Sequence, residues 1–266
     1  MYIEPPDLTS GDCGHRGGRG SLIQISYHSR VSLPCPQCAA RRGTVCLGLD
    51  DGAVARLFAL ATTERVRSGT WLVNPGDRAD DVWILRDGHA HVSRVTRDGK
   101  RQILAFMFPG DFFAFTYEER YVYGAYADTD LLLCRVPRAR FDAFASATPG
   151  FEHQLRIQLT RLLDSAQELI FTLGRKTALE RVASFIWYLQ YRQRKLGRAG
   201  PRFAIPMSRA DIADFLGLTS ESVSRALTRL RRDGLIELPA AGEVEVRDMA
   251  RLRELGIVIA EPSSRA

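Results

Sequence analysis

Three cysteines lie close together near the start of the chain. Cys35, Cys38 and Cys46 form the pattern C-x2-C-x7-C, whereas Cys13 and Cys134 lie apart from them. Thiolates at such spacing can close small chelate rings around a soft metal centre. An iron–sulfur cluster and a structural zinc ion each take four ligands, so a fourth ligand must come from elsewhere. The spacing therefore predicts a metal site and leaves the identity of the metal open.

Two simpler readings of the cysteines stay open. The trio would also suit a zinc knuckle completed by His28 or His15. Taken alone, Cys134 is equally typical of a small buried side chain in a strand. Disulfides are not expected, because the sequence has no secretory leader and no long apolar segment, which predicts a cytoplasmic protein with no membrane partner.

A second set of residues, near the C-terminus, has the chemistry of base recognition. Ser208 and Asp211 form a capping box that opens one helix, Gly217 supplies a tight turn, and Thr219 caps a second helix over 220–230. Two short capped helices joined at a glycine predict a helix-turn-helix. The strands expected at 235–238 and 243–246 add a hairpin wing.

The second of these helices carries side chains suited to DNA on its outward face. Arginine can bind guanine with two hydrogen bonds, glutamate accepts from cytosine, and serine is adaptable. Thirteen Lys and Arg against six Asp and Glu between 175 and 238 concentrate the positive charge here. Double-stranded DNA is the expected partner, contacted by Thr219, Ser220, Glu221, Ser224, Arg225 and Arg229, with Arg231 and Arg232 on phosphates.

Two further elements must position these groups. Short β-type runs between 71 and 138, separated by turn dipeptides about every eleven residues, predict an antiparallel sandwich, barrel or roll. A helix ending at Gly174 follows, and its apolar residues recur every three or four positions. This seam predicts a symmetric homodimer, with a core helix on the β domain as the alternative. Its members are Leu155, Leu159, Leu162, Ala166, Leu169 and Leu173, while Ile157, Leu163 and Ile170 are expected to face the domain.

The segment S-E-S-V-S-R at 220–225, after I-A-D-F-L-G-L-T at 212–219, resembles the recognition motif of the CRP/FNR superfamily, in its FNR branch. The likeness extends over about residues 35 to 250. It implies an α+β fold with an N-terminal antiparallel β-roll like a cyclic-nucleotide-binding domain, a long dimerisation helix and a C-terminal winged helix-turn-helix. It also implies that Glu221, Ser224 and Arg225 contact a palindrome of TTGAT-like half-sites, with RNA polymerase as a further partner.

The same resemblance suggests a use for the cysteines. It implies that Cys134 joins Cys35, Cys38 and Cys46 to hold a 4Fe-4S cluster, which makes the chain an oxygen-responsive activator at low oxygen and leaves Cys13 spare. The third cysteine follows after seven residues rather than the more familiar five, a variant that resembles α-proteobacterial relatives. Ala166 stands in the seam where some relatives carry an Asp, so no buried charge opposes dimerisation there.

The expected organisation has five parts. They are a flexible arm and cysteine loop at 1–50, a β-roll at 51–148, the dimerisation helix at 149–174, the winged helix-turn-helix at 175–250 and a tail at 251–266.

Other functions are weighed against this one. A regulator of the same family could hold a structural zinc ion, or it could lack a cluster, as FixK-like proteins do. Cyclic-nucleotide control would need a Gly-Glu pair and an Arg-Ser pair, and 111–125 supplies neither, although Glu118, Glu119 and Arg120 are present. Haem ligation by His28, His89, His91 or His153 is a weaker alternative. No enzyme motif occurs, so no catalytic residue and no enzymatic activity are expected.

Overall fold

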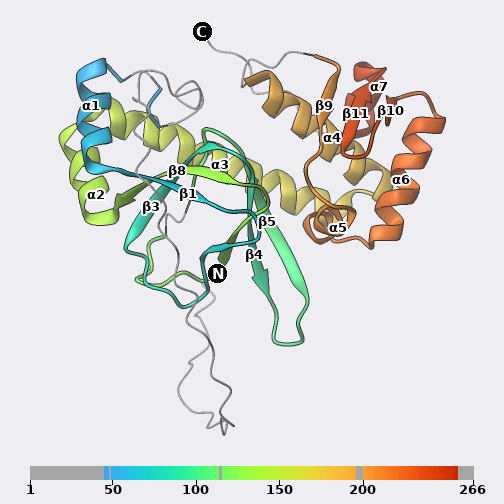
Figure 1. Ribbon diagram of the computed structural model, residues 1–266. Helices are drawn as coiled ribbons and strands as arrows, with labels where there is room; N and C mark the ends of the chain where they lie inside the picture. Colours follow the sequence, from blue (N-terminus) through green and yellow to red (C-terminus); the bar gives the residue numbers. More distant parts are fainter. Residues whose placement is uncertain (1–44, 48, 114–115, 196–199, 257–266) are drawn as a thin grey trace, which may run out of the picture.

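A computed structural model describes residues 45–47, 49–113, 116–195 and 200–256 of the 266-residue chain. A β-roll lies at one end, a long helix, α3 (Pro149–Arg175), crosses the centre, and a compact α-helical unit lies at the other end (Figure 1). This order of elements agrees with the α+β architecture expected from the sequence. Cys35, Cys38 and Cys13, as well as the arm before residue 45, lie outside the described residues.

The roll consists of two antiparallel four-stranded sheets, which enclose an apolar core. Their strand orders are β1-β8-β3-β6 and β2-β7-β4-β5. The strands are β1 (Thr62–Val66), β2 (Trp71–Val73), β3 (Asp81–Asp87), β4 (Ala90–Val95), β5 (Arg101–Met107), β6 (Phe112–Phe113), β7 (Gly124–Ala127) and β8 (Leu131–Pro137).

Glycines occupy the tight turns of the roll because the backbone there is left-handed. Gly88 joins β3 to β4 with a φ of 89°, and a Cβ atom on it would lie 2.3 Å from the carbonyl oxygen of Asp130. No other residue fits both the conformation and the space. The turn dipeptides of the sequence therefore mark real strand boundaries.

Strand β8 separates two apolar cores. Successive side chains of a strand point to opposite faces. Leu131 and Leu133 accordingly lie in the core between the two sheets, whereas Cys134 and Val136 lie in a second core. The sequence did not predict the helices α1 (Asp51–Leu60) and α2 (Arg138–Ala147). They pack in that second core together with Val82 and Ile84 of β3 and the start of α3.

Helix α3 is one residue longer than expected. It continues through Gly174 to Arg175, with Lys176 as its C-cap, so the prediction that Gly174 ends the helix was wrong. The prediction that Leu163 and Ile170 face the roll was also wrong, because these side chains are 58% and 70% exposed in the single chain. Leu162 is 55% exposed beside them, so the middle of the helix presents an uncovered apolar surface.

The C-terminal unit comprises four helices and a small sheet. Its helices are α4 (Ala178–Lys195), α5 (Arg209–Leu216), α6 (Ser220–Arg232) and α7 (Met249–Gly256). The expected wing is present as β10 (Ile236–Glu237) and β11 (Glu243–Val246), and β9 (Arg202–Ala204) pairs with β11 as an unpredicted third strand. Helix α7 crosses the boundary expected at residue 250, because Leu252 is fully buried in the core of this unit.

None of the helices in the described ranges is long and apolar enough to cross a lipid bilayer.

Two cations hold the junction between α3 and α4. Lys176 is buried and its Nζ donates to Glu168 Oε1 of α3 at 2.7 Å, to Ser184 Oγ of α4 at 3.0 Å and to the carbonyl oxygen of Gly256 in α7 at 2.7 Å. Arg181 donates to the carbonyl oxygens of Leu173 and Leu216, both at 2.8 Å. The end of the long helix is thereby tied to α4, α5 and α7.

We expect Lys176→Ala to lower the free energy of unfolding by about 1–3 kcal/mol, because the buried carbonyl oxygen of Gly256 and the part-buried oxygens of Glu168 and Ser184 lose their donor. Urea denaturation monitored by circular dichroism would measure the change. Lys100→Ala is the matched control, since that side chain is 83% exposed in a turn and should leave the midpoint unchanged. Equal midpoints for the two variants would contradict the structural role of Lys176.

Candidate nucleic-acid interface and cysteine site

The helix-turn-helix is built by the caps that the sequence predicts. Ser208 caps α5 by accepting from the Asp211 backbone N–H at 3.1 Å, and the Asp211 carboxylate accepts in return from the Ser208 backbone N–H at 3.2 Å. Gly217 follows with a φ of 60°, and Thr219 caps α6 by accepting from the Ser222 backbone N–H at 3.1 Å. The capping box, the glycine turn and the second cap are all confirmed.

Helix α6 has one buried face and one open face. Its buried residues are Val223, Ala226, Leu227 and Leu230, as expected from the spacing. On the other face, Arg225 and Glu221 are 69% and 75% exposed and form an ion pair of 2.8 Å within the helix. Ser220 and Ser224 are exposed beside them. The structure thus gathers one guanidinium, one carboxylate and two hydroxyls on the first turns of a protruding helix.

The last turn of the same helix carries a group of arginines. Arg229, Arg231 and Arg232 are all exposed, and the first and last of them lie 3.5 and 3.4 Å from Asp233. Exposed ion pairs of this kind are weak, so these guanidinium groups stay available to another anion. Arginines next to a base-reading surface are suited to phosphate contacts, which add affinity without sequence information.

Asp211 has a second partner outside its own unit. Its Oδ1 accepts from Arg101 Nη2 of the roll at 2.5 Å, and the neighbouring Asp214 accepts from Arg101 Nε at 2.7 Å. Burial by itself would raise the pKa of Asp211, but the hydrogen bonds from Ser208 and Arg101 outweigh it and hold the pKa below its ordinary value of 3.8. The carboxylate therefore stays ionised where it meets the arginine.

The two described cysteines of the expected set belong to one apolar cluster. Cys134 is buried, and Cys46 packs at the edge of the same core that contains Phe151 and Leu155 of α3. Cys134 reaches this core because its strand position points it away from the roll interior. The structure thus brings two of the four expected ligands to the base of the long helix, whereas Cys35 and Cys38 lie outside the described residues.

The roll interior differs from a nucleotide site. Tyr121 is buried there, its hydroxyl donates to the carbonyl oxygen of Asp81 at 2.9 Å, and Tyr123 packs against the same core. Burial raises the pKa of both tyrosines to about 12, so they remain neutral hydroxyls. Glu118, Glu119 and Arg120 lie exposed on the outer surface. These three charged side chains therefore lie in water and not in the apolar core of the roll.

Comparisons with known proteins agree with this geometry. Residues 63–148 match the model of the cyclic nucleotide-binding domain, and residues 180–255 match that of the Crp-like helix-turn-helix domain. A probable transcriptional activator of Rhizobium leguminosarum bv. viciae is 33% identical over 229 residues, which cover 86% of this chain and 95% of the relative. The chain belongs to the CRP/FNR family.

Two further comparisons show to which branch of the CRP/FNR family the chain belongs. The transcriptional activator protein FnrL of Cereibacter sphaeroides is 34% identical over 83% of this chain and 90% of its own length. The solved structure of FixK2 from Bradyrhizobium japonicum superposes with a TM-score of 0.70 and 32% identity, over 75% of this chain and 99% of that one. The chain is thus a DNA-binding transcription regulator of the FNR branch, and regulators of this family are not enzymes.

Sequence reasoning missed the residues that join the two units of this regulator. Arg101 and Asp211 are 110 residues apart, and Arg192 and Asp111 are 81 apart, so neither pair has a local spacing that a pattern could reveal. Each of these charges could equally have been solvated. Only the fold brings them together.

We expect Arg225→Ala to cost about 1–3 kcal/mol of DNA affinity and to relax the preference at one base pair, because the exposed guanidinium of Arg225 is suited to two hydrogen bonds with one guanine. Arg231→Ala should weaken binding to all sequences alike. It should also reduce by about 1 the steepness with which the logarithm of the binding constant falls with the logarithm of the salt concentration. Fluorescence anisotropy against a set of singly substituted sites at several salt concentrations separates the two. Uniform weakening by Arg225→Ala would exclude a base contact.

We expect Asp211→Asn to destabilise the chain at neutral pH and to lose this effect in acid. Because the pKa of Asp211 is lowered on folding, its carboxylate stabilises the folded state above pH 3.8, and the stabilisation is lost as the pH falls through the lowered pKa. Urea midpoints of both proteins, measured from neutral to strongly acid pH, should converge. A gap that stays constant into acid would contradict this assignment.

Proposed function

We propose that this regulator is an oxygen-responsive transcription activator, active at low oxygen as a homodimer that binds palindromic TTGAT-like half-sites. The observation that carries the proposal is the position of Cys46 and Cys134 in one core with the first turns of α3. The similarity to an FNR-branch activator, FnrL, supports it. By the same similarity, we propose that it acts in the cytoplasm and contacts RNA polymerase.

The sensing residues of the proposal are Cys35, Cys38, Cys46 and Cys134. Four thiolates suit a 4Fe-4S cluster, and a sulfur already buried in an apolar core has little access to water. When bound, such a cluster supplies an oxygen-sensitive link between the segment before α1 and strand β8. Cys46 lies just before α1, between Val45 and Leu49, which are buried in the same core as Val82 of β3, so its segment is anchored to the roll.

The base of α3 is the part of the chain that would respond to the cysteines. Phe151 is fully buried and its ring lies edge-on to those of Phe141 and Phe144, at 5.3 and 5.0 Å between centroids. Leu155 packs against the same core one turn later. A packed interior transmits small displacements because it has few voids. A shift of the Cys46 segment would therefore reach the first turns of the long helix.

The dimer of the proposal forms along α3. Leu162 and Ala166 of the expected seam are exposed in the single chain, and Leu163 and Ile170 beside them are exposed as well. A contiguous apolar surface on a 27-residue helix is typical of a helix that packs against a second helix. A symmetric pair would place two copies of α6 for two half-sites about one DNA turn apart, or ~34 Å.

We expect protein purified without oxygen to contain about four iron atoms per chain and to show a broad absorption band that bleaches in air. Cys38→Ala and Cys134→Ala should each lose the iron and the anaerobic activation of a reporter gene. Cys13→Ala is the matched control, since this cysteine is spare in the proposal and should keep both. Absorption, iron, sulfide and zinc analysis would measure the difference.

Two results would overturn the oxygen-sensing proposal. A colourless protein with one zinc ion per chain would replace the sensor with a structural site. A protein without metal, and equally active with and without oxygen, would indicate control by its own expression, as in FixK-like regulators. Both results would leave the DNA-binding assignment intact.

A further inference from the structure

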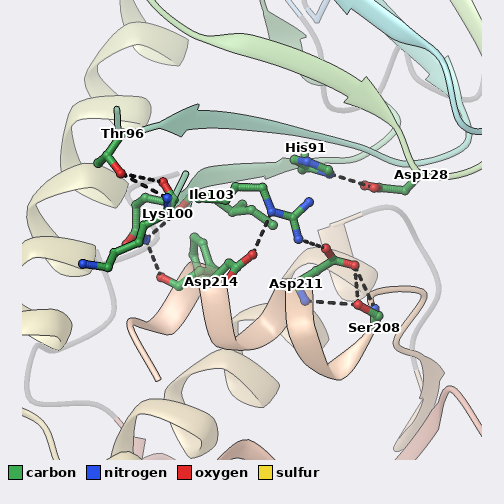
Figure 2. A network of polar contacts seen from close by, with 11 residues as sticks. His91, Thr96, Lys100, Ile103, Asp128, Ser208, Asp211 and Asp214 are labelled. Carbon is green, nitrogen blue, oxygen red and sulfur yellow. Dashed lines mark hydrogen bonds and ion pairs between the residues drawn. The ribbon is translucent and has the colours of Figure 1, made fainter. Parts of the chain in front are cut away.

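An arginine of the β-roll is paired with the helix-turn-helix of the same chain. Arg101 begins β5, and its guanidinium lies between Asp211 and Asp214, one helical turn apart on α5. Figure 2 shows both carboxylates projecting from α5 toward the β4–β5 hairpin, and Asp211 at the same time bonded to Ser208. The Arg101 side chain is 31% exposed and the two carboxylates 21% and 32%, so water screens this pair only in part.

A second ionic contact runs in the opposite sense. Arg192 of α4 donates to both carboxylate oxygens of Asp111 at 2.6 Å, and Asp111 lies in the turn that follows β5. The guanidinium also lies over the ring of Phe108, 5.2 Å from its centroid. Here the cation belongs to the C-terminal unit and the anion to the roll, whereas the Arg101 contact has the reverse arrangement.

An apolar contact fills the space between these two ion pairs. The ring of Phe106 in β5 lies 5.9 Å from that of Phe185 in α4 and 5.1 Å from that of Phe215 in α5. Ile103 is fully buried in the same core. Gln102 adds a hydrogen bond of 3.2 Å from its Nε2 to the carbonyl oxygen of Phe215. Strand β5 and the turn after it therefore touch both α4 and α5.

The two ion pairs restrict the angle between the C-terminal unit and the roll, which the apolar contact alone specifies less sharply. Apolar burial is non-directional, so the apolar contact specifies the angle between the C-terminal unit and the roll less sharply than an ion pair does. A planar guanidinium that binds two carboxylates on one helix is directional. Because α5 leads into α6 through the single turn at Gly217, an orientation imposed on α5 is passed directly to the recognition helix.

We propose that Arg101 is a positioning residue for DNA reading, which holds α5 and thereby α6 at the angle at which two half-sites are read together. It acts through Asp211 and Asp214 and does not itself contact DNA. The inference rests on the proposed homodimer, because the relative angle of two recognition helices matters only when both bind. Loss of the Arg101 contact should weaken the preference for one spacing between half-sites and leave the recognition of each half-site unchanged.

The test compares Arg101→Ala with Arg94→Ala in the full-length protein. Arg94 is an exposed residue of β4, on the same hairpin, and makes no ion pair with any residue in the described ranges, so its variant loses the same charge without the contact. Binding is measured by fluorescence anisotropy to a palindrome, to the same half-sites separated by two further base pairs, and to one half-site alone.

Arg101→Ala should bind the palindrome about fivefold or more weakly, and discriminate less against the lengthened site, while half-site affinity stays within about twofold of the parent. Arg94→Ala should match the parent on all three DNAs. Asp214→Ala should change palindrome binding in the same direction by a smaller amount, because Arg101 keeps its bond to Asp211. The double variant should bind like Arg101→Ala alone, since Asp214 acts through Arg101.

Three outcomes would overturn the inference. One is unchanged palindrome affinity in Arg101→Ala. Another is an equal loss on palindrome and half-site together with a lower melting temperature, which would assign Arg101 to folding alone. The third is full additivity of the two substitutions. Sedimentation of the parent protein on its own tests the proposed function. A monomeric parent would overturn the proposed homodimer, whereas the three outcomes above, obtained with a dimeric parent, would overturn the role of Arg101.

Discussion

The arrangement of this regulator depends on the burial of one face of strand β5. Ile103, Phe106 and Phe108 of the roll lie in the same apolar core as Phe185 and the helices of the C-terminal unit. Burying aromatic rings supplies most of the free energy of such a contact, and neighbouring ions give it direction. Without that shared core, the recognition helix would be joined to the roll only through α3 and a few polar contacts of Arg101, Gln102 and Arg192.

Charge is used in two different ways along the chain. The arginines on the outer face of α6 are exposed and weakly paired, which suits a surface that binds the phosphates of DNA. In contrast, Lys176 is buried at the end of α3 and its ammonium group has three oxygen partners. Buried charges must be paired, so these contacts permit few alternative geometries. The same type of residue therefore serves recognition on the surface and rigidity inside.

The β-roll keeps the fold of a nucleotide-binding domain but uses its two faces differently. The interior side of β8 packs with Tyr121 and its neighbours, while the opposite side carries Cys134 toward α1 and α3. One strand thus separates a core filled by side chains from a core that lies beside the long helix. In the proposed function, the signal would enter on the second of these sides, at the base of α3.

Features that depend on local chemistry could be predicted from the residues alone. Ser208, Gly217 and Thr219 predicted the helix-turn-helix, and short β-type runs between turn dipeptides predicted the roll, because caps and turns act within a few residues. Tertiary structure alone decided that Leu163 and Ile170 are uncovered, that α7 extends past residue 250, and that Arg101 meets Asp211 and Asp214. Contacts between residues more than 100 positions apart leave no local pattern. Each charged residue fits its own segment equally well whether it is paired or solvated.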